Sequence, residues 1–268
     1  MPPPIALQPP RHYGAVNWLG LWSHYRRGIH RFMDFAWESL GGPCVFTLMF
    51  LAVFVVAFGA ETEVVAGLTY ARFIAPGLIM FALCYTAFEA SAFAVLDDKQ
   101  HRMIEDLLAA PLTPLEVMAG YVLSAVTCAV MTGTLVGVMV AFFAGLELLA
   151  PLTILVFAVL GTLLFALLGT LTGLWADKWE HYSFADSFMV LPLGLLSGTF
   201  FPVASLPEFG KLLIAVNPVF YAIDGFRAGF VPYAESQAWM AALVVLLLDL
   251  ALWALVWRLF ARGYKIKA

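Results

Sequence analysis

Six stretches of this 268-residue chain are apolar and near or above the length that a helix needs to cross a lipid bilayer. They lie at residues 43–59, 73–96, 115–146, 151–176, 184–203 and 238–258. The chain is 63% hydrophobic and 12% charged, whereas soluble domains have roughly 45 to 50% apolar and about 25% charged residues. A water-soluble globule is therefore excluded, and the sequence predicts an all-α membrane protein with six transmembrane helices in a domain at 40–260.

An amphipathic helix is predicted ahead of the first span, over residues 13–39. Apolar residues such as Trp18 and Trp22 recur every three or four positions, and a basic face carries Arg26, Arg27 and Arg31. Such a helix is too charged to cross the bilayer, so we expect it at the cytoplasmic interface with its basic face against anionic headgroups. Packing on a soluble neighbour is the alternative. The proline-rich residues 1–12 do not resemble a signal peptide and are expected to be disordered.

The segment 204–237 is apolar but broken into pieces that are too short to cross the membrane. Residues 205–208 (SLPE) are typical of a helix start, and 217–218 (NP) predict a stop. Each predicted helix has about 12 residues, roughly 18 Å, so neither spans alone. This pattern predicts a re-entrant helical hairpin at the extracellular side, before the last span.

The distribution of lysine and arginine favours that layout. With the hairpin re-entrant, eleven basic residues are cytoplasmic and three are extracellular. The eleven are Arg11, Arg26, Arg27, Arg31, Lys99, Arg102, Lys178, Arg258, Arg262, Lys265 and Lys267, and the three are Arg72, Lys211 and Arg227. A hairpin that crossed would give seven on each side and abolish the bias. The positive-inside rule therefore predicts that both termini, including the basic tail 261–268, and the loop 97–113 are cytoplasmic.

Motifs for catalysis are absent from the sequence. Gly210-Lys211 is followed by Leu212, so there is no Walker A motif, and neither HExxH nor GxSxG occurs. The three cysteines lie in apolar runs without metal-ligand spacing. We expect no catalytic residue, no metal and no cofactor in this chain, and no nucleic-acid partner.

The loop after the second predicted span contains a short amphipathic helix. Ile104, Leu107 and Leu108 form an apolar stripe, and Glu105 and Asp106 form a polar one. A capping box at 113–116 (TPLE) fixes the start of the third span. This helix is either a solvated connector or a docking site for a protein that supplies energy.

Several of these motifs resemble the ABC-2 type permeases, and most closely the small bacterial branch with nodulation-factor and anthracycline export permeases. The likeness covers residues 15 to 260. The motifs are 104–113 (IEDLLAAPLT), 118–121 (MAGY), 196–202 (LSGTFFP), 206–207 (LP), 217–218 (NP) and 225–230 (GFRAGF).

The resemblance implies a permease of a bacterial inner-membrane exporter of type V architecture. It implies a partnership with a second copy of the chain and with two ATP-binding subunits that use ATP and Mg²⁺. The implied coupling helix contains Ile104, Glu105, Asp106, Leu107, Leu108 and Pro111. The implied extracellular gate contains Pro202, Pro207, Asn217, Pro218, Asp224 and Arg227.

Two acids, Glu89 and Asp249, lie well inside predicted spans, where each should face protein or water. Each is either hydrogen-bonded to a neighbouring Ser or Thr or used in translocation or coupling. Asp224 and Arg227 are three residues apart and form either a local pair or a gate contact.

The substrate path is predicted between two copies of the chain. The interfacial helix and the second and fifth spans are expected to line it. Their aromatic residues are Phe73, Phe81, Phe88, Phe188 and Phe200. Such a lining favours a lipid or lipid-linked amphiphile, then a hydrophobic drug, then a polysaccharide that Arg227 or the basic helix would contact. A lipid-modifying membrane enzyme and a scaffold without transport are the alternatives from other classes.

Overall fold

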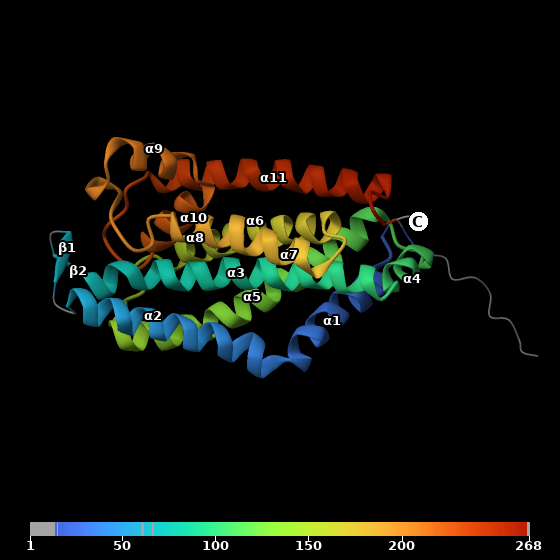
Figure 1. The fold of residues 1–268 in the computed structure, drawn as a ribbon, viewed down its shortest axis with the longest axis horizontal. Coiled ribbons are helices and arrows are strands. Elements are labelled where there is room, and N and C mark those ends of the chain that lie inside the picture. Colours follow the sequence, from blue (N-terminus) through green and yellow to red (C-terminus); the bar gives the residue numbers. More distant parts are fainter. Residues whose placement is uncertain (1–13, 15, 60–61, 66, 267–268) are drawn as a thin grey trace, which may run out of the picture.

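The computed structural model describes residues 14, 16–59, 62–65 and 67–266 as a bundle of long helices (Figure 1). Five helical segments are long and apolar enough to cross a membrane. They are Trp37–Phe58, which joins a π-helical turn η1 (Trp37–Gly41) to α2 (Gly42–Phe58), and α3 (Tyr70–Gln100), α5 (Pro114–Ala144), α6 (Pro151–Trp175) and α11 (Ala238–Arg262). The predicted first, second, third, fourth and last spans are thus helical.

The two ends of the bundle carry different short elements. Helix α1 (Trp18–Asp34) starts near α4 (Met103–Ala109) and near the C-terminal end of α11; we call this the α4 end (Figure 1). The antiparallel strands β1 (Glu63–Val65) and β2 (Leu68–Thr69) mark the opposite, β-hairpin end. Residues 1–13 lie outside the described part of the chain.

Helix α3 forms the centre of the bundle, between α5 and α6. Gly169 of α6 lets the two helices touch, because a Cβ atom there would lie 2.3 Å from the carbonyl oxygen of Phe88. Close approach through glycine is typical of packed membrane helices. Of the aromatic residues expected along the substrate path, Phe73, Phe81 and Phe88 are buried inside one chain, whereas Phe188 is 69% exposed.

The fifth predicted span, 184–203, differs most from the structure. Helical residues run from Trp179 to Leu195 as α7 (Trp179–Ala185), a π-helical turn η2 (Asp186–Val190) and α8 (Leu191–Leu195). The chain then turns at Gly198, whose φ of 69° suits glycine. The carbonyls left free by this early end are satisfied by side chains, since Asn217 Nδ2 donates to Leu193 O at 2.8 Å and Arg227 Nη2 to Gly198 O at 2.6 Å.

A bent pair of short helices follows the turn. After a 3₁₀ turn η3 (Val203–Ser205), α9 (Glu208–Val216) and α10 (Pro218–Arg227) meet at 89°. The Asn217 side chain caps α10 by accepting from Val219 N at 3.0 Å. The predicted cap at Ser205 is wrong, because its hydroxyl donates to Pro202 O and α9 begins only after Pro207.

Both ends of the bent segment lie at the β-hairpin end of the bundle. The Tyr70 hydroxyl at the start of α3 donates to Phe200 O at 3.0 Å, and the amide of Ala150 at the start of α6 donates to Gly229 O at 3.0 Å. The two ends also meet each other, since Val203 N donates to the Glu235 carboxylate at 2.8 Å. Length and composition alone fit either a broken span or a re-entrant pair.

Candidate functional site

A buried carboxylate, Asp98, binds helix α1 to the bundle at the α4 end. Asp98 lies near the C-terminus of α3 and is fully buried. It pairs with the guanidinium groups of Arg27 and Arg31 on α1, and it accepts a hydrogen bond from the Tyr121 hydroxyl of α5 at 2.6 Å. Arg31 also donates to the carbonyl of Ala94 at 2.9 Å. One negative charge thus joins three helices.

Two of the three arginines on the basic face of α1, Arg27 and Arg31, therefore contact the protein, whereas Arg26 is exposed. Arg27 and Arg31 are four residues apart and so lie on one face of the helix; the helix packs on α5, and these two side chains reach α3. Trp18 and Trp22 lie on the outer side and are 72% and 59% exposed. The sequence prediction missed Asp98, although an acidic pair at 97–98 next to the span end was a signal for an ionic partner.

His24 of α1 lies beside Asp98 and its partners, and it adds contacts between α1 and α5. It is 5% exposed, its ring packs edge-on against Tyr121 with centroids 4.5 Å apart, and its Nε2 bonds to Val117 O at 3.1 Å. Burial, followed by the positive charge of Arg27, lowers the pKa of His24 to about 4. The imidazole is therefore neutral at pH 7, and its Nε2–H donates to the carbonyl.

A second carboxylate, Glu116, ties the starts of α1 and α5 together. Its Oε2 accepts from Thr113 N at 2.6 Å and Thr113 Oγ1 accepts from Glu116 N at 3.3 Å, which confirms the predicted capping box. Its Oε1 accepts from Asn17 N at 2.6 Å, and Asn17 Nδ2 donates to Pro111 O at 3.0 Å. Two hydrogen bonds of Asn17 thus connect the start of α1 to the α4–α5 turn and to the start of α5.

The residues of the implied coupling helix form α4 and the turn after it. Ile104 is 4% exposed and anchors the helix to the bundle, whereas Leu108 is 40% exposed. Glu105, Asp106 and Pro111 are exposed as well, and Leu107 is half-buried. Helix α4 lies at the extreme end of the molecule, where these side chains are accessible to another protein (Figure 1).

Two residues of the implied gate, Asp224 and Arg227, are buried in the bundle. Asp224 and Arg227 are both fully buried, with Oδ1 and Nη1 3.7 Å apart, so the predicted local pair forms. Arg227 lies over the ring of Phe73, 4.1 Å from its centroid, and Asp224 accepts hydrogen bonds from Ser236 N and Oγ. In this structure the Arg227 guanidinium is therefore shielded from solvent and paired with Asp224. The prolines 202, 207 and 218 lie at the turns around α9.

The two intramembrane acids have different surroundings. Asp249 of α11 is 2% exposed, and neither carboxylate oxygen has a hydrogen-bond partner among the described residues, so the expected Ser or Thr partner is not found there. Glu89 of α3 is half-buried and lines a cavity.

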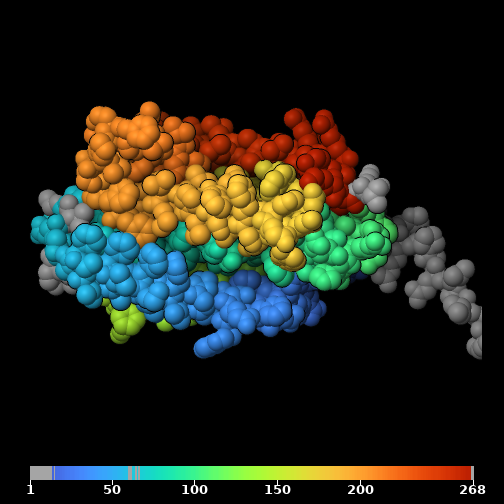
Figure 2. All heavy atoms as spheres, in the orientation of Figure 1, coloured from blue at the N-terminus to red at the C-terminus, as the bar shows by residue number. Residues whose placement is uncertain are grey.

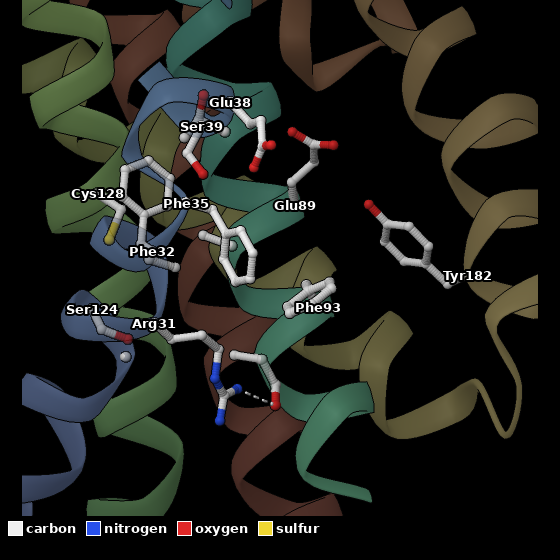
Figure 3. Close-up of a pocket in the computed structure, with 15 residues that line it drawn as sticks. Arg31, Phe32, Phe35, Glu38, Ser39, Glu89, Phe93, Ser124, Cys128 and Tyr182 are labelled. Carbon is white, nitrogen blue, oxygen red and sulfur yellow. Dashed lines mark hydrogen bonds between the residues drawn. The ribbon is translucent and has the colours of Figure 1, made fainter. Parts of the chain in front are cut away.

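This cavity has a volume of about 320 Å³ and lies between α1 with η1, α3, α5 and α7. It is lined by Gly28, Arg31, Phe32, Phe35, Glu38, Ser39, Thr86, Glu89, Ala90, Phe93, Ala94, Ser124, Ala125, Cys128 and Tyr182. Figure 3 shows Arg31 at one end, Glu38 and Glu89 at the other, and Phe35 and Phe93 between them. The space-filling view in Figure 2 shows α3 between the blue N-terminal helices and the yellow segment that contains α7.

Comparisons with known proteins agree with this architecture. The ABC-2 type transporter family matches residues 23–231. The chain is 30% identical to the inner membrane transport permease YadH of Escherichia coli K12, over 94% of this chain and 99% of YadH. It is 28% identical to nodulation protein J of Rhizobium leguminosarum bv. viciae, over 80% of this chain and 82% of that protein. With five membrane-length helices and a family match over most of its length, the chain belongs to the ABC-2 type transporter family.

Proposed function

We propose that this chain is the permease subunit of an inner-membrane exporter that moves an amphipathic, lipid or lipid-linked substrate. Two copies would work with two separate ATP-binding subunits that hold ATP and Mg²⁺. The observation that carries the proposal is the cavity between α1, α3, α5 and α7, because aromatic walls with polar groups at both ends suit an amphiphile. The name of the relative YadH, an inner membrane transport permease, supports transport in that membrane.

A mechanical link supports the ATP-dependent part of the proposal. Helix α4 ends at the turn whose Pro111 carbonyl is held by Asn17, and Asn17 starts α1. Helix α1 in turn forms one wall of the cavity through Phe32 and Arg31. A partner that pushes on α4 would therefore change the cavity, without a second contact inside the membrane.

The alternatives differ in how well they fit the cavity. A hydrophobic drug would be bound by the same apolar and aromatic cavity walls as a lipid, and it remains the second candidate. A free polysaccharide is the third, since Arg227 is buried and Arg27 and Arg31 are already paired with Asp98, with Asp97 lying 3.8 Å from Arg31. A lipid-modifying enzyme lacks support, because no cluster of three metal-ligating residues occurs among the described residues.

The proposal is tested by ATP hydrolysis in nanodiscs. The permease is reconstituted with an ATP-binding subunit that co-purifies with it, and lipids, hydrophobic drugs and soluble glycans are added in turn. We expect amphiphiles to stimulate hydrolysis, because a bound substrate favours the state that engages the ATPase. Stimulation by a soluble glycan alone would contradict the proposed substrate class. If no ATPase co-purifies with the chain, the proposal that it is a subunit of an ATP-driven exporter is contradicted.

The proposed membrane topology has the α4 end in the cytoplasm and the α9–α10 pair re-entrant from outside. In a variant without Cys44, Cys84 and Cys128, we introduce Tyr264→Cys, at a position 41% exposed beside the end of α11. An impermeant thiol reagent should label it only after the cells are opened, because the positive-inside rule keeps this end inside. Glu147→Cys, in the loop between α5 and α6, is the matched control and should react in intact cells. Labelling of position 264 from outside would exclude the re-entrant pair.

A further inference from the structure

Two carboxylates at one end of the cavity have no countercharge. Glu38 of η1 and Glu89 of α3 line the same cavity, and neither forms an ion pair with any residue of the described chain. Arg31 is the only cationic residue among those that line it, and it is already paired with Asp98 and lies 3.8 Å from Asp97. Figure 3 shows the two glutamates at the end away from Arg31.

Glu89 lies deep along a membrane-spanning helix, where a carboxylate without a cationic partner is energetically unfavourable. Glu89 lies eleven residues before the end of α3 at Gln100, which places it roughly 16 Å along the helix from that end at 1.5 Å per residue. Acids at such depth face a cavity or a partner and mark functional sites. A third acid is close to the same wall, since the Tyr85 hydroxyl, one turn before Glu89, donates to Asp186 Oδ2 at 3.3 Å. The local potential therefore favours a cation and disfavours an anion.

A second observation points to a ligand with hydrogen-bond donors. Thr86 lines the cavity and is 2% exposed, yet its hydroxyl has no hydrogen-bond partner within the described chain. Buried hydroxyl groups are normally paired, so an unpaired one in a cavity wall marks a position for a ligand atom. Two carboxylates and one hydroxyl match the three N–H donors of a primary ammonium group.

The remaining walls fit the apolar part of the same ligand. Phe35 and Phe93 lie between the two polar ends in Figure 3, and they are 58% and 40% exposed in the single chain. Aromatic faces attract organic cations as well as alkyl chains. A bare metal ion fits less well, because such walls offer it no ligand and no group of three metal-ligating side chains occurs in the described residues.

We propose that this cavity binds the protonated amine of an amphipathic molecule, with the ammonium group between Glu38 and Glu89 and the apolar part along Phe35 and Phe93. The inference rests on the proposed transport of amphiphiles and narrows it to amine-bearing ones. The ammonium can belong to a free amphiphilic amine or to a lipid headgroup such as phosphatidylethanolamine. Both provide the same chemistry, and the experiment distinguishes them.

The test uses the purified permease alone, in phosphatidylglycerol nanodiscs. Three photoreactive probes share one diazirine-bearing alkyl chain and differ only in an ammonium, hydroxyl or carboxylate head, and mass spectrometry maps the labelled residues. We expect the ammonium probe to label the cavity walls about tenfold more than the hydroxyl probe, as a hydrogen bond to a charged group predicts. Glu89→Gln and Glu38→Gln should each remove most of that preference, and Thr86→Val should weaken it.

Glu147→Gln, an exposed acid outside the cavity, is the matched control and should leave labelling unchanged. Equal labelling by the three heads, or an ammonium preference that survives both glutamine substitutions in folded protein, would overturn the inference. Adding phosphatidylethanolamine to the nanodiscs identifies the source: competition indicates the lipid headgroup, and undiminished labelling indicates a free amine. The labelling assay contains no ATPase and therefore tests the site alone. If the ammonium probe binds here but no amphiphile stimulates hydrolysis in the assay with the ATPase, the proposed function is contradicted and the proposed site is not.

Discussion

Replacing Asp98 with alanine is expected to release helix α1 from the bundle and to stop transport. The change leaves Arg27 and Arg31 without their buried partner and the Tyr121 hydroxyl without its acceptor. Removing one partner of a buried ion pair costs about 3 kcal/mol or more. Cys128, which lines the cavity beneath α1, provides the measurement. With Cys44 and Cys84 replaced by serine, a membrane-permeant thiol reagent should modify Cys128 much faster in the Asp98→Ala variant.

Asp97→Ala is the matched control for this experiment. Asp97 is the neighbouring acid, but its carboxylate is 3.8 Å from Arg31 Nε and its side chain is 20% exposed. Partly exposed ion pairs contribute at most about 1 kcal/mol, so Cys128 should stay protected and transport should continue. Similar effects from the two substitutions would mean that Asp98 is not the specific anchor of α1.

Five of the six spans and the cap at the start of α5 were predictable because they depend on local sequence. An apolar run of membrane length has few alternatives to a transmembrane helix, and the Thr113 to Glu116 capping box formed as its spacing predicted. Hydropathy does not distinguish a helix that faces lipid from one that faces other helices, because both environments are apolar. This is why hydropathy did not show that Phe73, Phe81 and Phe88 of α3 are buried within one chain.

The errors at the fifth span and at α1 have a different origin, in contacts between distant residues. The break after Leu195 depends on Asn217 and Arg227, which lie more than twenty residues later and satisfy the free carbonyls. The inward turn of Arg27 depends on Asp98, 71 residues away in the sequence. Helical periodicity shows only that the basic residues share a face, and it does not show whether that face meets lipid or protein.

The substitution Leu108→Asp is expected to abolish binding of the ATP-binding subunit while leaving the permease folded. Leu108 is 40% exposed on α4, so a charge there disturbs little inside the chain, but it would place a carboxylate in a docking surface. Losing an apolar anchor of an interface costs about 2 kcal/mol or more, which is at least about a thirtyfold loss of affinity. Glu105→Lys, on the same helix, should act similarly by reversing a charge.

Co-purification of the ATPase with a tagged permease measures the effect, and the melting temperature of the permease alone shows whether it is folded. Glu147→Lys, which carries the same charge reversal at the opposite end of the bundle, should retain the ATPase. Ile104→Ala separates docking from folding, because Ile104 is 4% exposed and its loss should lower the melting temperature. If Leu108→Asp and Glu105→Lys both retain the ATPase and transport, then α4 is a solvated connector and the coupling contact lies elsewhere.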